Sequence, residues 1–260
     1  PERFAQWIHR EDKTKDVYLA STNKRVVPLT HYAYMSVNDG QLKTFKDKAM
    51  VKDIRDNTNK LICLQSDKNV FQEEGYNTLK RIHKTCNDNK LTIKRKQVLN
   101  NVCKMLHAKE MTPAICFIFS RKLIEVCASE ITVPLLEDDS KVSYTVAREC
   151  EQIVRRLPNF KEYMELPEYV QLVSLLEKGI GIHHSGMLPI LREIVEIMIS
   201  KKYIKLLFAT ESFAIGLDCP IKTAMFASLT KYDGHYDRFL MGHEYTQMAG
   251  RAGRRGIDTI

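Results

Sequence analysis

Three side chains near the carboxyl end could together handle a phosphate group. Gln247, Arg251 and Arg254 lie at i, i+4 and i+7 in the stretch QMAGRAGRRG, so a helix running through it would place all three on one face. Two guanidiniums and an amide aimed at one point suit the spread charge of a transferring phosphoryl group. Gly250 and Gly253 leave the adjacent strip free of side chains, so we expect the helix to approach other backbone closely. The alternative is a solvated Gly/Arg-rich tail that binds nucleic acid loosely.

Polar side chains also follow three expected strands, at the point where each strand ends. They are Ser120 and Arg121 after the apolar run 114–119, His183, His184, Ser185 and Gly186 after 179–182, and Thr210 and Glu211 after 206–209. In a parallel sheet the carboxyl ends lie along one edge, where ligands bind and helix N-termini offer free N–H groups. Ordinary helix capping is the alternative, since Ser and Thr make good N-caps. Three such sites together favour a ligand edge.

The elements that would position these side chains alternate between strand and helix. We expect strands at 114–119, 179–182, 206–209 and 223–228, and helices at 94–107, 121–130, 142–157, 168–178, 189–201 and from Glu244 onward. This alternation indicates an α/β fold with a parallel sheet. Two extended pieces, 16–21 and 26–35, precede it. Residues 36–93 are polar and weakly periodic, and are either a surface insertion or a long connection containing helices.

Composition excludes several classes of protein. The chain has 260 residues, of which 44% are hydrophobic and 28% charged, which excludes disordered and fibrous classes. The formal net charge is +8, and residues 1–110 carry 22 Lys and Arg against 13 Asp and Glu, so a basic surface would belong mostly to that part. Seven isolated cysteines without a CxxC pair indicate a reducing compartment rather than a disulfide framework or zinc module. No apolar run approaches the ~20 residues of a membrane span, and no signal peptide opens the chain, so we expect an intracellular protein without a membrane partner.

Four strings carry a resemblance to a known family. They are QMAGRAGRRG at 247–256, FATESFAIGLDCP at 208–220, GIGIHHSGMLP at 179–189 and KYDG at 231–234. Together they closely resemble the second RecA-like domain of superfamily 2 DExH-box helicases, in the subgroup of superkiller-type RNA helicases that feed the RNA exosome. The resemblance implies a parallel-sheet RecA-like helicase C-terminal domain at 28–260, with a polar elaboration at about 36–93. Residues 1–27 would connect it to a first RecA-like domain.

The resemblance also implies a role for each motif. Gln247, Arg251 and Arg254 would reach the ATP γ-phosphate, with Arg254 as the arginine finger. Gly216 and Asp218 would face the nucleotide, although Asn is expected in much of this subgroup at the position of Asp218. The nucleic-acid side would comprise Ser120, Arg121, His184, Ser185, Gly186, Thr210 and Glu211, with Thr210 contacting the nucleic-acid backbone.

Two motifs of such a motor do not occur in the chain. It has no GxxxxGK[ST] phosphate loop and no DExH tetrapeptide. Both would belong to a first RecA-like domain upstream of Pro1, so the chain is expected to be truncated at both ends and inactive alone. ATP and Mg²⁺ are the implied cofactors, with Mg²⁺ held by that first domain. The implied partners are single-stranded RNA, the first RecA-like domain and the RNA exosome or its adaptors, in the nucleus or cytoplasm, with 3′-to-5′ movement.

Other functions compete with the RNA helicase. A DNA helicase of the related repair group has a similar arginine motif, although the strings at 231–234 and 179–189 favour the RNA subgroup. A non-catalytic helicase-like scaffold is a second alternative, but it would not need Gln247, Arg251 and Arg254. We expect no metal site from His183, His184 and Cys219, because no second ligand pair has zinc spacing.

Overall fold

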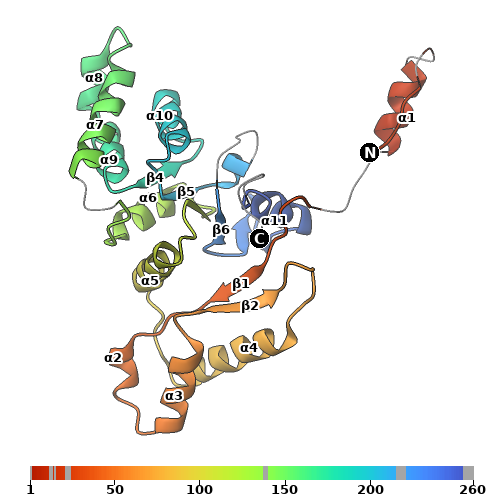
Figure 1. Ribbon diagram of the computed structural model, residues 1–260, viewed down its shortest axis with the longest axis vertical. Coiled ribbons are helices and arrows are strands. Elements are labelled where there is room, and N and C mark those ends of the chain that lie inside the picture. The colour runs from red at the N-terminus through yellow and green to blue at the C-terminus, as the bar shows by residue number, and fades with distance from the viewer. Residues whose placement is uncertain are drawn as a thin grey trace.

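A four-stranded parallel sheet forms the centre of the larger of two units (Figure 1). The computed structural model describes residues 2–11, 14, 16–20, 25–136, 140–214 and 221–253. The strand order is β4-β5-β3-β6, and every neighbouring pair is parallel. The strands are β3 (Ala114–Phe117), β4 (Ile180–His183), β5 (Leu206–Ala209) and β6 (Thr223–Phe226). The expected α/β class with a parallel sheet is therefore confirmed.

Three of the four strands, β3, β4 and β5, are buried along their whole length, although successive side chains of a strand point to opposite faces. Continuous burial of this kind requires packing on both faces of the sheet. Phe117 and Phe208 are fully buried at its centre. Of the two edge strands, β4 is buried throughout whereas β6 is only half-buried.

Helices that precede, separate and follow these strands along the chain supply that cover. They are α5 (Arg95–Ala108), α6 (Arg121–Glu130), α7 (Ser140–Val154), α8 (Phe160–Glu165), α9 (Pro167–Leu176), α10 (Pro189–Ser200), the 3₁₀ helix η1 (Glu211–Ala214) and α11 (Gly242–Ala249). Of these, α6, α9 and α10 contact β4 directly. Proline opens both α9 and α10, where its fixed φ suits the first helical turn and its missing N–H costs nothing. None of the described helices has the length and apolar character that crossing a bilayer needs.

A smaller unit with its own core precedes the parallel sheet. Its elements are β1 (His31–Tyr34), α2 (Asp39–Leu42), α3 (Lys48–Asn57), β2 (Leu61–Gln65) and α4 (Glu73–Asp88). β1 and β2 pair antiparallel, and α4 packs on β2. Gly75 permits that approach, since a Cβ there would lie 2.1 Å from the carbonyl oxygen of Cys63. The buried side chains of this core are Met35, Val37, Leu42, Val51, Ile54, Ile82 and Cys86.

This part of the structure bears on two expectations for the first part of the chain. The polar elaboration at 36–93 does contain helices, as one of its two alternatives expected, and these helices and β2 enclose apolar side chains. The extended piece expected at 16–21 forms no strand in its described part, 16–20, and only His31–Tyr34 of the piece at 26–35 is a strand. Helix α1 (Glu2–Glu11) lies away from both units (Figure 1) and has no buried residue.

A short antiparallel hairpin between β6 and α11 was not expected from the sequence pattern. It consists of β7 (Thr230–Tyr232) and β8 (Asp237–Phe239). In its turn, the Asp233 carboxylate accepts hydrogen bonds from the backbone N–H groups of His235 (2.9 Å) and Tyr236 (3.1 Å). Gly234 adopts φ +107°, which favours glycine. The hairpin thus has specific turn chemistry although each strand is only three residues long.

Candidate functional site

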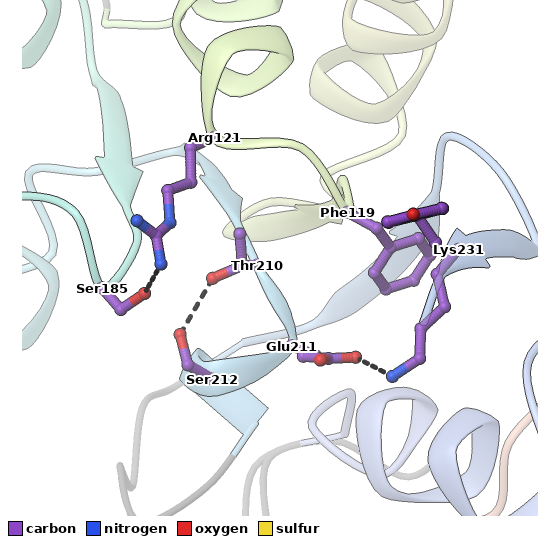
Figure 2. A pocket seen from close by; sticks show the side chains of 8 residues that line it. Phe119, Arg121, Ser185, Thr210, Glu211, Ser212 and Lys231 are labelled. Atoms are coloured by element: carbon purple, nitrogen blue, oxygen red, sulfur yellow. Dashed lines mark hydrogen bonds and ion pairs between the residues drawn. The ribbon is translucent and has the colours of Figure 1, made fainter. Parts of the chain in front are cut away.

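The strand order brings three of the expected strand ends side by side. β5 lies between β4 and β3, so the residues that follow these strands meet at one edge of the sheet. A pocket of about 200 Å³ opens there (Figure 2). Its lining residues are Phe119, Arg121, Ser185, Thr210, Glu211, Ser212, Lys231 and Tyr232. We call it the strand-end pocket.

Arg121 and Ser185 face each other across one side of the strand-end pocket (Figure 2). The Arg121 Nη2 donates to the Ser185 Oγ at 3.0 Å. Arg121 is the first residue of α6, and Ser120 caps that helix by accepting a hydrogen bond from the backbone N–H of Leu123 at 3.3 Å. Ser120 therefore fits the capping alternative, whereas Arg121 presents an exposed guanidinium and a hydroxyl partner to the pocket.

His184 lies behind the pocket rather than in it. It is 4% exposed, and its Nδ1 accepts the backbone N–H of Gly186 at 3.2 Å. That bond requires the proton on Nε2, which lies 3.6 Å from a Glu125 carboxylate oxygen. Burial lowers the pKa of His184, opposed by the charge of Glu125. His184 and Gly186 thus shape the loop that holds Ser185, and His184 does not meet solvent.

The loop after β5 supplies the other polar side of the pocket. The hydroxyls of Thr210 and Ser212 hydrogen-bond at 2.9 Å. The Glu211 carboxylate receives the Lys231 Nζ at 2.6 Å. Because Glu211 is ion-paired, its charge is offset at the place where an anion would enter. The pocket therefore offers the cation of Arg121, a second cation on Lys231 that is paired with Glu211 and Glu244, and hydroxyl donors, a donor set that suits a phosphate.

The structure brings together four of the expected nucleic-acid residues and adds four others. Arg121, Ser185, Thr210 and Glu211 line the pocket, whereas Ser120, His184 and Gly186 do not. The residues that sequence reasoning missed are Phe119, Ser212, Lys231 and Tyr232. Lys231 and Tyr232 stand in the KYDG string, so the string that carried the resemblance also held the missing cation and aromatic ring.

Helix α11 ends earlier than the expected spacing of Gln247, Arg251 and Arg254 requires. Its last residue is Ala249. The N–H of Ala252 still bonds to the carbonyl of Ala249 at 3.1 Å, but Gly253 turns to φ +89°. The condition for the i, i+4, i+7 face, a helix running through 247–254, is therefore not met at Gly253. Arg251 instead donates to the backbone carbonyl of Ala214, at the end of η1.

The end of α11 is held by a segment that sequence reasoning did not select. Arg25 Nη2 donates to the carbonyl of Gly250 at 3.0 Å and also to that of Ala252. A cation at a helix C-terminus satisfies free carbonyls and opposes the helix dipole. A Cβ on Gly253 would lie 2.9 Å from Val27, so the close approach expected at this glycine is present, although to a side chain.

The residues expected to face ATP are only partly described. Gly216, Asp218 and Arg254 lie outside the described residues. Gln247 is exposed and Arg251 half-buried at the same end of α11. An exposed amide beside a guanidinium provides donors that fit phosphate oxygens. Among the residues that the structure does describe, no group of three His, Cys, Asp or Glu side chains could hold a metal ion.

Comparisons with known proteins agree with this architecture. No protein-family model matches the chain. Similar proteins include DExH-box ATP-dependent RNA helicase DExH11 of Arabidopsis thaliana (33% identical), Exosome RNA helicase MTR4 of Homo sapiens (31%) and Superkiller complex protein 2 of Homo sapiens (34%). Each similarity covers 98% of this chain and 21%, 23% and 20% of the respective relative. The chain thus spans about a fifth of the length of these curated relatives, and the resemblance that the motifs predicted is confirmed.

Proposed function

Since this chain is a homologue of the DExH-box RNA helicases of the Mtr4 and Ski2 type, we propose that it is the second RecA-like half of an ATP-dependent RNA helicase motor. Residues 28–260 form this half, and 1–27 lead in from a first RecA-like domain. The intact protein unwinds or remodels RNA for processing or degradation, moving 3′ to 5′. The juxtaposition of Arg121, Ser185 and Thr210 at one sheet edge carries this proposal.

Single-stranded RNA binds across the strand-end pocket through its phosphates. Arg121 and Lys231 provide charge, and the hydroxyls of Ser185 and Thr210 donate hydrogen bonds. Contacts of this kind fix the strand without reading its sequence. Tyr232 is 63% exposed at the pocket, where its ring can receive a base by stacking. Glu211 holds Lys231 in place rather than meeting the phosphates.

ATP binds against the opposite end of α11. Gln247, Arg251 and Arg254 donate to its γ-phosphate, with Gly216 and Asp218 beside the nucleotide. ATP with Mg²⁺ supplies a phosphoryl group whose charge spreads during transfer to water. Guanidiniums placed at that charge stabilise the transition state more than the bound ground state. The phosphate loop and the Mg²⁺ ligands come from the first domain, so the chain 1–260 alone does not hydrolyse ATP.

Cellular context follows from the relatives' names. Those names include exosome and superkiller complexes, so we propose that the intact protein delivers RNA to the exosome or to its adaptors, inside the cell. A DNA helicase of the repair group is the alternative, and the relatives named as RNA helicases weigh against it.

The test is ATP hydrolysis by the full-length protein with no nucleic acid, with single-stranded RNA and with single-stranded DNA. We expect RNA to stimulate turnover and Arg254→Ala to lower the stimulated rate by about 10³–10⁵-fold, the effect of an arginine finger. The matched control is Arg148→Ala, which removes an exposed arginine on α7 and leaves the rate unchanged. Stimulation by DNA alone would support the repair helicase, and no turnover from the wild type would support a scaffold.

A further inference from the structure

Glu244 binds both strands of the β7–β8 hairpin to the start of α11. Its carboxylate receives Nη1 and Nη2 of Arg238, each at 2.9 Å, and lies 2.8 Å from the Nζ of Lys231. The backbone N–H of Met241 donates to it at 2.8 Å. The side chains of Glu244, Lys231 and Arg238 are only 16%, 12% and 19% exposed. Because these charges are shielded from solvent and the Arg238 guanidinium binds the carboxylate in a bidentate manner, this link is far more rigid than a surface ion pair.

Lys231 extends the link to the strand-end pocket. Its Nζ also lies 2.6 Å from the Glu211 carboxylate. Glu211 is the first residue of η1 and follows Thr210 directly. The start of α11 is therefore joined to the start of η1 through Glu244, Lys231 and Glu211.

The other ends of the same two helices are joined as well. Arg251, two residues after the end of α11, donates to the carbonyl of Ala214, the last residue of η1. η1 and α11 thus form a closed frame. One corner is Lys231, which lines the pocket, and the opposite corner is Arg251, which stands among the ATP-facing residues of the proposed function.

We propose that Glu244 is a positioning residue that couples RNA in the strand-end pocket to the placement of Arg251. This inference rests on the proposed function. An RNA phosphate entering the pocket competes with Glu211 for Lys231 and weakens the link from Lys231 to η1. Glu244 still ties Lys231, and with it the bound phosphate, to α11. The free energy of RNA binding therefore depends on the position of α11. Such a dependence is the condition for coupling between two sites.

The charge of the frame is present at neutral pH. Hydrogen bonds from Arg238 and Lys231 hold the pKa of Glu244 well below its ordinary value. Burial opposes the charge of Lys231, but its hydrogen bonds to Glu211 and Glu244 raise its pKa. Glu244 is thus ionised at neutral pH.

The experiment compares RNA-free and RNA-stimulated ATP hydrolysis by the full-length protein carrying Glu244→Gln. Gln keeps the size of the side chain and an acceptor for Met241, but loses the charge that holds Lys231 and Arg238. We expect the RNA-stimulated kcat to fall about tenfold, while the RNA-free rate and the KM for ATP stay within about twofold. Arg238→Lys, which keeps the cation but loses the bidentate contact, should lower the same parameter less.

Glu149→Gln is the matched control. It makes the same chemical change in the pair (2.5 Å) between Glu149 of α7 and Lys201, the residue after α10, away from the frame, and should leave the RNA-stimulated kcat unchanged. RNA stimulation of wild-type strength in both Glu244→Gln and Arg238→Lys would overturn the inference and leave the proposed function standing. An equal loss in Glu149→Gln would overturn it too, since the effect would then be general. A wild type without RNA stimulation would overturn the proposed function itself.

Discussion

The two units of this protein use apolar residues in different ways. In the larger unit, β3, β4 and β5 are buried along their whole length, and the polar side chains gather just beyond the strand ends. In the smaller unit, a two-stranded sheet and the helices α3 and α4 enclose a few apolar side chains among many polar ones. The larger unit contains every residue of the strand-end pocket. A sheet that is covered on both faces leaves its strand ends as the place for polar, ligand-binding side chains. A sheet that is covered on one face mainly contributes to the protein surface.

The largest expected effect tests the two-sided core. Phe208→Ala removes a fully buried ring from β5, and we expect it to lower the free energy of unfolding by about 3–5 kcal/mol. Urea denaturation of the chain would measure the change. The matched control is Phe239→Ala, at a ring that is 76% exposed on β8, which should change the value by less than about 0.5 kcal/mol. Similar losses from both variants would contradict the burial described for β5.

A second substitution asks whether the smaller unit has an independent core. Ile82→Ala removes a fully buried side chain from α4 and should cost about 2–5 kcal/mol locally. Hydrogen exchange should show faster amide exchange in β2 and α4, with β3 and β5 unchanged. The neighbouring exposed residue supplies the control, His83→Ala. Equal loss of protection in both units would mean that they unfold as one.

The smallest effect is a pH dependence at the loop behind the pocket. Burial lowers the pKa of His184 from its ordinary value of 6.5. The charge of Glu125 opposes this shift, whereas the charges of Arg121 and His183 add to it. Between the lowered value and 6.5 the unfolded chain binds more protons, so stability falls as pH falls through this window. Protonation of Nδ1 would also remove the acceptor for Gly186.

Unfolding free energies of the wild type and His184→Asn, measured from about pH 7 to about pH 5, would show this. Asn does not titrate but can still accept a hydrogen bond, so its curve should be flatter. The control His235→Asn, at an exposed histidine, should follow the wild type. A His184→Asn curve as steep as that of the wild type would contradict the assignment.

Sequence reasoning succeeded where one residue pattern decided the structure. The apolar run at 114–119 is typical of a strand covered on both sides, and β3 (Ala114–Phe117) within it is such a strand. It failed for β2, because the pattern of Leu61–Gln65 is mixed and its burial depends on α4. It also left open how far α11 runs, because the end of this helix depends on Gly253, which leaves helical backbone, and on Arg25, more than 200 residues earlier in the chain, which binds the helix end.

The candidate site shows the same division. Arg121, Ser185 and Thr210 were predictable because each follows a strand of a parallel sheet. The role of Lys231 was not, because it depends on contacts with Glu211 and Glu244 that no periodicity links. The burial of His184 was likewise missed, since a polar residue after a strand can turn inward to hold a loop as readily as outward to hold a ligand.

The most direct test of the account is the affinity of the full-length protein for single-stranded RNA with and without Arg121. We predict that Arg121→Ala raises the Kd about tenfold and lowers the salt dependence of binding by about one phosphate contact. Arg155→Ala, at an arginine paired with Glu151 on α7, should bind RNA as the wild type does. If Arg121→Ala also bound RNA with the wild-type Kd and salt dependence, the strand-end pocket would not be the RNA site.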